Sequence, residues 1–125
     1  MKQVTFTKIA ILALNLDTQK EEEKALTDAG LKFKPLMGVY KGQSERSYLV
    51  PLTVHNTGLV FGLARKYNQE SILISDIDRS TKLVYLKGHG SEESIGVLTH
   101  VSEGKAKSHD GYTYDPKSNQ YWVAI

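Results

Sequence analysis

The chain has 125 residues, the length of one ordinary domain, and 40% of them are hydrophobic. Its 16 basic and 14 acidic residues are interspersed and leave a net charge of +2, so no strong field for nucleic acid or a membrane surface is expected. The absence of cysteine excludes disulfides, thiol catalysis and thiolate metal sites. The first residues carry no signal-peptide pattern and the apolar run 9–14 is too short to cross a bilayer, so we expect a cytoplasmic protein.

The first predicted elements are a strand, a helix and a second strand. Residues 5–14 are apolar and β-branched, which is typical of a buried central strand. Thr18 and Glu21 form a capping-box pattern at the start of a helix, and Gly30 is a natural residue to end it. Residues 31–40 alternate in part and predict the second strand.

A polar segment, residues 38–47, leads into a third predicted strand at 48–52. These two strands form a predicted hairpin with the polar segment as its loop. A second helix begins at Asn56 or Thr57, and Gly62 within it predicts close packing against the sheet. The apolar face expected for this helix consists of Leu59, Val60, Leu63, Ala64 and Tyr67.

The remainder of the chain predicts further strands separated by polar turns. The strands are expected at 71–75, 82–86, 95–101, 112–114 and 121–123. Turns are expected at Gly88-His89-Gly90 and at 115–119, the latter within a hairpin.

The order β-α-β-β-α-β predicts an α+β fold of the ferredoxin-like type, with extra C-terminal strands and one domain over residues 1–125. Both helices would cover one face of a four-stranded sheet. The other face must be buried, either by an oligomer or by the C-terminal strands.

The polar segment 38–47 is the strongest functional candidate, because it holds a tyrosine, a lysine, a glutamate, an arginine and two serines beside two glycines. Such a hairpin tip is either a solvated turn or a functional loop on a rigid sheet. The four histidines have no metal-ligand spacing, so no metal site is expected. The serines and histidines form no nucleophile motif.

Several segments together resemble a known family. They are Gly38-Val39-Tyr40, Glu45-Arg46-Ser47, Leu63-Ala64-Arg65 with Gln69, Ile72-Leu73-Ile74, the run 82–88, and the aromatic close at 111–115 and 120–123. This pattern resembles the S-adenosylmethionine (SAM)-cleaving anti-restriction enzymes of bacteriophages, the SAM lyases, formerly called SAM hydrolases.

The resemblance implies a fold like that of the trimeric PII signalling proteins, with an active site between subunits. It implies that Tyr40 and Glu45 are catalytic, and that the segment 38–47 corresponds to the long mobile loop of PII-like proteins. The substrate-binding residues it implies are Gly38, Val39, Gly42 and Ser47. It implies no cofactor, since SAM is the substrate.

The reaction implied is attack by the carboxylate of SAM on its own γ-carbon, which releases 5′-methylthioadenosine and L-homoserine lactone. Because the leaving group is already a cation, this chemistry needs neither a general acid nor a protein nucleophile. By this reaction a phage depletes SAM and evades host restriction. Two other hypotheses stay open: a non-catalytic PII-like module that binds a nucleotide or SAM, and a phage inhibitor that acts by protein contact.

Overall fold

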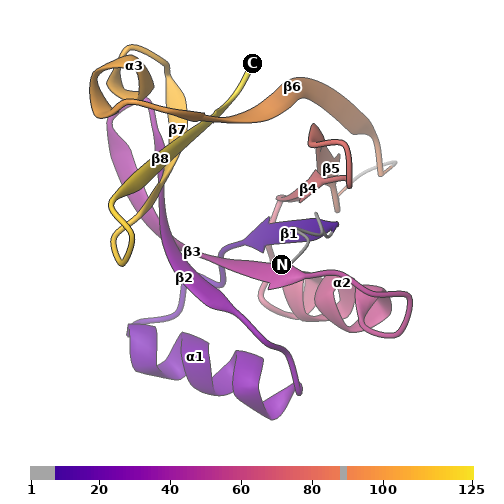
Figure 1. Cartoon of the computed structure of the whole chain (residues 1–125). Coiled ribbons are helices and arrows are strands. Elements are labelled where there is room, and N and C mark those ends of the chain that lie inside the picture. Colours follow the sequence, from indigo (N-terminus) through magenta and orange to yellow (C-terminus); the bar gives the residue numbers. More distant parts are fainter. Residues whose placement is uncertain (1–7, 88–89) are drawn as a thin grey trace, which may run out of the picture.

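A computed structural model describes residues 8–87 and 90–125, which form eight strands and three helices. Figure 1 shows their arrangement. Their bounds are β1 Ile9–Leu12, α1 Gln19–Asp28, β2 Lys34–Tyr40, β3 Gln43–Pro51, α2 Thr57–Lys66, β4 Ser71–Ser75, β5 Ser80–Tyr85, β6 Glu92–Val101, α3 Glu103–Lys107, β7 Gly111–Asp115 and β8 Gln120–Ala124. Residues 5–7 of the predicted first strand, and residues 88–89 of the predicted glycine turn, lie outside the described residues.

The strands form one closed barrel in the order β1-β3-β2-β7-β8-β6-β5-β4, and β4 pairs with β1 to complete it. Every pairing is antiparallel. The fold is therefore α+β, as predicted, and its first four strands lie side by side as β4-β1-β3-β2. The later strands close the ring opposite these four and cover part of their second face, as one of the two alternatives drawn from the sequence predicted.

Helix α1 has the predicted ends. The side chain of Thr18 accepts a hydrogen bond from the Glu21 backbone N–H at 3.1 Å, and the Thr18 hydroxyl donates to the Glu21 carboxylate at 3.0 Å. Gly30 follows the helix with a φ of +75°, a left-handed conformation that glycine adopts without steric cost.

The segment 38–47 is not a long loop. Strands β2 and β3 continue through it to a two-residue tip, Lys41-Gly42, at which φ is +49° and +80°. Positive φ at both central residues is the type I′ pattern, whose twist matches that of the flanking strands. The pairing therefore extends to Tyr40 and Gln43, and the expected correspondence to a long mobile loop is wrong for this chain.

Helix α2 begins after Asn56, as predicted, but its apolar face is narrower than predicted. Val60 and Ala64 are fully buried, whereas Leu59 is 53% exposed. Gly62 is exposed and a Cβ there would meet nothing within 4 Å, so the expected close packing at this glycine is wrong. Leu63 and Tyr67 are half-buried and pack against the core beside Val60 and Ala64, so four of the five predicted residues face the core, and Gly62 lies on the solvent side.

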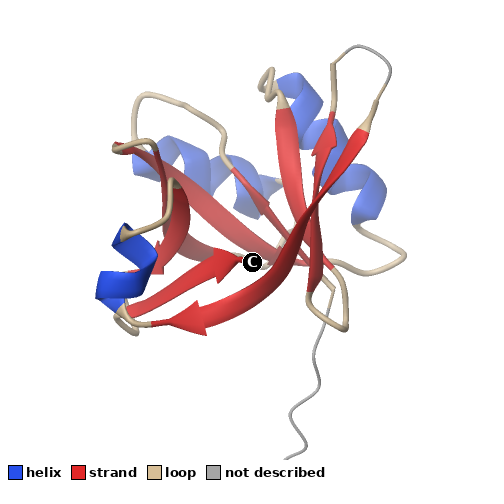
Figure 2. Ribbon diagram, turned by 90° about the horizontal axis from the view of Figure 1, so that it is seen from above, coloured by secondary structure: helices blue, strands red, loops and turns tan. Residues whose placement is uncertain are grey.

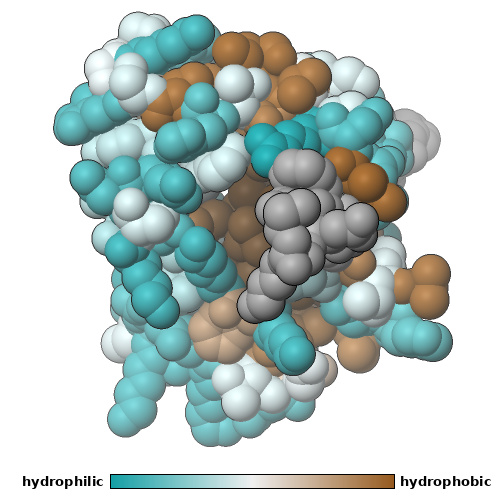
Figure 3. All heavy atoms as spheres, in the orientation of Figure 1, coloured by the Kyte–Doolittle hydropathy of each residue, from teal (hydrophilic) through white to brown (hydrophobic). Residues whose placement is uncertain are grey.

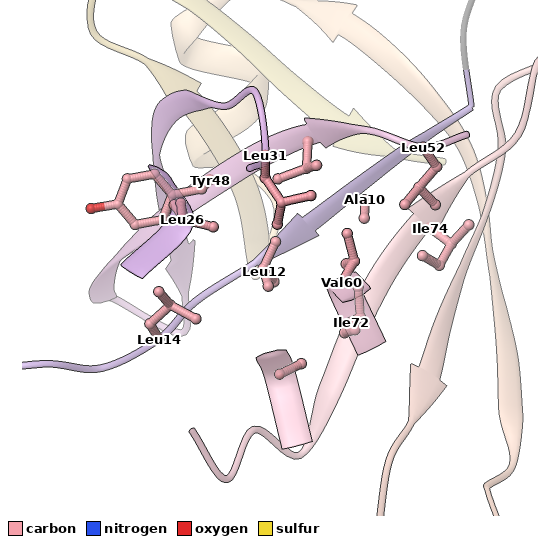
Figure 4. Packing of buried hydrophobic residues seen from close by; sticks show 12 residues of the cluster. Ala10, Leu12, Leu14, Leu26, Leu31, Tyr48, Leu52, Val60, Ile72 and Ile74 are labelled. Atoms are coloured by element: carbon pink, nitrogen blue, oxygen red, sulfur yellow. The ribbon is translucent and has the colours of Figure 1, made fainter. Parts of the chain in front are cut away.

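The main core lies between the sheet and helices α1 and α2 (Figure 4). Alternate residues of β1, β3 and β4 point toward the helices, because side chains along a strand alternate between its faces. The buried members are Ala10, Leu12, Leu14, Leu26, Leu31, Tyr48, Val50, Leu52, Val60, Ala64, Ile72 and Ile74. This face is the outer face of the barrel, and the helices lie outside the ring of strands (Figure 2).

The C-terminal hairpin forms as predicted, with strands β7 and β8 around the turn 116–119. The short helix α3 was not predicted. Ser102 caps it by accepting from the Lys105 backbone N–H at 3.3 Å, and Ala106 is its buried contact. Among the described residues, no helix is both long enough and apolar enough to span a membrane.

Candidate active site

The register of the β2–β3 hairpin places both predicted catalytic residues on one face. Gly38 pairs with Glu45 and Tyr40 pairs with Gln43, so alternation puts Tyr40, Gly38 and Glu45 on the same side. Ser47 lies two residues beyond Glu45 and shares that side. This side of the hairpin is the inner face of the barrel, because Leu36 and Leu49 on the same side line the cavity.

Two other predicted binding residues lie elsewhere. Val39 alternates to the outer face, and Gly42 is at the exposed tip. Both border a second hollow beneath α3, which Lys107, His109 and other residues also line. The six predicted site residues are therefore divided, with four on the inner face and two on the outer side.

The barrel encloses an open-ended cavity of about 300 Å³. Figure 3 shows a hollow in this face of the molecule with apolar side chains in its walls. Such a volume is at the lower end of the range that holds small-molecule ligands. The lining comes from seven strands and the β4–β5 turn, and comprises Ile9, Ile11, Lys34, Leu36, Leu49, Ser75, Asp76, Arg79, Leu98, Thr113, Asp115, Gln120 and Trp122.

Ser47 is a buried hydroxyl without a hydrogen-bond partner among the described residues. Ser47 is 6% exposed. It lies directly opposite Leu36 in the β2–β3 register, and Leu36 lines the cavity. A Cβ at Gly38 would lie 3.5 Å from the Ser47 Oγ, so the missing side chain leaves space next to this hydroxyl. A buried polar group is normally paired, so an unpaired one at a cavity is suited to a ligand.

Tyr40 and Glu45 are available to a ligand. Tyr40 is 63% exposed and packs over Gly111, where a Cβ would lie 3.2 Å from the tyrosine ring. The carboxylate of Glu45 is exposed and makes no hydrogen bond or ion pair with any described residue. An anion and an aromatic ring on one face suit a cationic ligand.

A second tyrosine and carboxylate form a pair on β5 and β6, and sequence reasoning missed them. The hydroxyl of Tyr85 donates to the carboxylate of Glu93 at 3.3 Å. Burial, then the charge of Glu93 and finally Tyr40 raise the pKa of Tyr85 above its usual value. Tyr40 thus lies within electrostatic reach of Tyr85, although β2 and β5 are not neighbours in the sheet. No local pattern in the sequence indicates this pairing.

The strand that carries Glu45 and Ser47 is anchored from the outside. Glu22, on α1, is 1% exposed and accepts hydrogen bonds from Arg46 Nε at 2.7 Å and the Tyr48 hydroxyl at 2.9 Å. It also accepts from the Leu16 backbone N–H at 3.0 Å. Burial is the main reason that the pKa of Tyr48 is raised, and Glu22 adds to it. Arg46, on the predicted polar segment, therefore has a structural role.

Within residues 8–87 and 90–125, no three histidine or acidic side chains are grouped as metal ligands. The inner face offers an apolar cavity, the buried unpaired hydroxyl of Ser47 beside it, and the exposed Glu45 and Tyr40 further along the same hairpin. The ammonium of Lys41 lies 5.3 Å from the centre of the Tyr40 ring. This combination suits a small molecule that carries a positive charge and apolar surface, and it makes the region a candidate site.

The family model for the S-Adenosylmethionine lyase family matches residues 6–125, which is nearly the whole chain. The chain belongs to this family, and it is an enzyme that acts on SAM. No curated protein matches it. Membership favours the catalytic hypothesis over the nucleotide-binding module and the protein inhibitor, because neither of those predicts turnover of SAM.

Proposed function

We propose that this protein is a SAM lyase that forms 5′-methylthioadenosine and L-homoserine lactone. A carboxylate oxygen of SAM forms a bond to the γ-carbon while the bond from that carbon to sulfur breaks. The electron pair goes to sulfur, which becomes a neutral thioether, and no proton is transferred. The observation that carries the proposal is the family match over residues 6–125.

The site supports this chemistry because the reaction neutralises charge. A carboxylate and a sulfonium combine into two products that lack both charges at the reacting atoms. Water stabilises the separated charges more than the transition state, so an apolar cavity that excludes water favours the reaction. The remaining task is to hold SAM in the attacking conformation, which is a proximity effect.

In this proposal Glu45 holds the ammonium group and Tyr40 packs against the sulfonium. Both groups are on the inner face and exposed, and the sulfonium would take the place of the Lys41 ammonium, which lies 5.3 Å from the centre of the Tyr40 ring. The expected use of the Gly38 backbone for the adenine is not proposed again, because β3 and β7 pair with β2 at that residue on both sides. Its N–H and C=O belong to the sheet.

We further propose that the β4-β1-β3-β2 strands with α1 and α2 are a ferredoxin-like, PII-like core, and that β5 to β8 are its extension. The strand order and the antiparallel pairings support this relationship. The proposal also includes a homotrimer with its active sites near the subunit boundaries. The enzyme would act in the cytoplasm of a phage-infected host, where depletion of SAM blocks restriction. The open carboxylate of Glu45 is consistent with a contribution from a neighbouring subunit.

Product analysis tests the reaction. Purified protein incubated with SAM should release 5′-methylthioadenosine, and the second product should be homoserine lactone, whereas a hydrolase would form homoserine directly. Glu45→Gln and Tyr40→Phe should each lower turnover tenfold or more, or about 1.4 kcal/mol per factor of ten. Ser44→Ala, an exposed neighbour on the opposite face of the same strand, is the matched control. Wild-type turnover in both variants would contradict the assigned roles.

A further inference from the structure

We propose that SAM lies across the inner face of the barrel between Glu45 and Trp122, with its adenine against the indole of Trp122. This inference rests on the proposed function and extends it, because Trp122 is most simply a core residue when only the sequence is considered. It makes Trp122 and Thr113 substrate-binding residues and gives the cavity its occupant.

The strand registers connect these residues into one row. Glu45 pairs with Gly38, Gly38 with Thr113, and Thr113 with Trp122. Directly paired residues share a face of the sheet, so the whole row lies on the inner face. Thr113 and Trp122 line the cavity, which confirms the direction in which the row points.

The row has the shape of a shallow trough. Its two middle positions, Gly38 and Thr113, are small, whereas a carboxylate and an indole lie at its ends. Neighbouring strands are about 4.8 Å apart, so three spacings separate Glu45 from Trp122 by about 14 Å along the sheet. SAM is an elongated molecule with an ammonium group at one end and a purine at the other, and it matches this order of groups.

Neighbouring side chains hold the indole in the cavity wall. His100 pairs with Trp122 across β6 and β8, and their ring centroids are 5.1 Å apart. The guanidinium of Arg79 lies 5.6 Å from the centre of the indole. An indole held in this way is preorganised for stacking, so little freedom is lost when a flat ligand binds.

Ser47 is the second observation that indicates a ligand. Its buried, unpaired Oγ lies beside the space that Gly38 leaves, next to the middle of the row. A ligand lying along the row would pass this hydroxyl and give it a partner. The hydroxyl groups of a ribose and the carboxylate of an amino acid are both suitable, since a serine hydroxyl donates and accepts.

Trp122 is the single tryptophan of the chain, so its fluorescence reports on the cavity directly. We expect 5′-methylthioadenosine and adenosine to change the emission of the wild-type protein saturably. L-homoserine lactone, which has no base, should leave it unchanged. This measurement needs no turnover and no variant, and it therefore remains informative if the catalytic proposal fails.

Two substitutions test the row through kinetics. Trp122→Leu should raise the KM for SAM at least tenfold, and Trp122→Phe should raise it less, because a smaller ring still stacks. Gly38→Ala should also raise KM, since its methyl group fills the trough beside Ser47 at an ordinary contact distance. Tyr121→Leu, which alters the neighbouring aromatic residue on the outer face, is the matched control and should leave KM unchanged.

The outcomes separate this inference from the proposed function. If SAM is cleaved but saturating 5′-methylthioadenosine leaves the emission constant, and Trp122→Leu keeps the wild-type KM, the inference is overturned and the lyase assignment stands. If SAM is not cleaved, the lyase assignment fails, while an emission change with adenosine still supports a nucleoside site at Trp122.

Discussion

At the scale of single residues, Glu22 shows how a buried charge can hold the strand that carries the candidate residues. Its carboxylate joins α1 to β3 through Arg46 and Tyr48, and to the segment before α1 through Leu16. The next inward-facing residues on that strand are Glu45 and Ser47. Loss of the carboxylate would leave a guanidinium and a phenol without their partner.

We predict that Glu22→Ala lowers the free energy of unfolding by about 1–3 kcal/mol, because it leaves the buried Tyr48 hydroxyl without its acceptor and removes the ion pair with the partly exposed Arg46. Urea denaturation measures this loss. Glu23→Ala, one position along the same helix, removes only a surface hydrogen bond with Gln19 and should change stability by less than about 1 kcal/mol. If Glu22→Ala lowers the free energy of unfolding no more than Glu23→Ala does, the network does not stabilise the fold.

Asp115 is the second buried carboxylate, at the end of β7. Burial opposes its ionisation, but hydrogen bonds from Lys34, Ser118 and the Lys117 backbone outweigh that effect and lower its pKa to about 2. Lys34 also forms an ion pair with it. The residue closes the β7–β8 turn and one end of the cavity.

We predict that Asp115 makes stability depend on pH in the acid range. Its folded pKa is below its unfolded value of 3.8, so its contribution of about 2 kcal/mol is complete above pH 4 and is lost as pH falls toward 2. In urea denaturation from pH 5 to pH 2, the stability of Asp115→Asn should fall less steeply than that of the wild type. If the stability of both proteins falls equally steeply with pH, Asp115 is not the source of the pH dependence.

At the scale of elements, two glycines have opposite roles. Gly42 has a φ of +80° at the hairpin tip, where a side chain is strained. Gly62 has neither a positive φ nor a neighbour that a methyl group would touch, and it lies exposed within α2. Glycine in the middle of a helix weakens it.

We therefore predict opposite signs for the same substitution. Gly42→Ala should destabilise the protein by about 1–2 kcal/mol, because the left-handed conformation disfavours a Cβ. Gly62→Ala should stabilise it by about 0.5–1 kcal/mol. Thermal unfolding measures both. A stabilising Gly42→Ala would rule out the two-residue turn, and a strongly destabilising Gly62→Ala would indicate that another surface covers α2.

At the scale of the whole molecule, closure of the barrel removes one reason to expect an oligomer, namely the burial of the second face of the sheet. Closure of the ring by β5 to β8 covers most of the second face of the first four strands, so a trimer is not required to bury its apolar part. The trimer proposal therefore depends on the site, where Glu45 and the exposed ring of Tyr40 lie open.

We predict a trimer in solution, with a mass three times the 14.0 kDa of one chain in sedimentation equilibrium. Glu45→Arg should weaken a trimer that has this side chain near its interface, since it reverses a charge there. Lys24→Glu also reverses a charge, but on the exposed surface of α1, and should leave the mass unchanged. A monomer that cleaves SAM at the full rate would contradict the shared site.

Local features were predictable from the sequence because local forces determine them. The α1 cap at Thr18, the β4 strand and the C-terminal hairpin turn depend on residues within a few positions of each other. The placement of Tyr40 and Glu45 on one hairpin followed from the same patterns. What remained hidden was the length of the hairpin, since a Lys-Gly type I′ tip is a weak signal within a polar segment.

The sequence by itself determined the α+β order of elements, the buried apolar strands and the hairpin that carries the candidate residues. Only the tertiary structure decided that the sheet closes, that Val39 lies outside while Ser47 lies inside, and that Trp122 shares a row with Glu45. The physical reason is register. A shift of one residue reverses every side chain of a strand, and pairing between distant strands is set by the packing of the whole barrel.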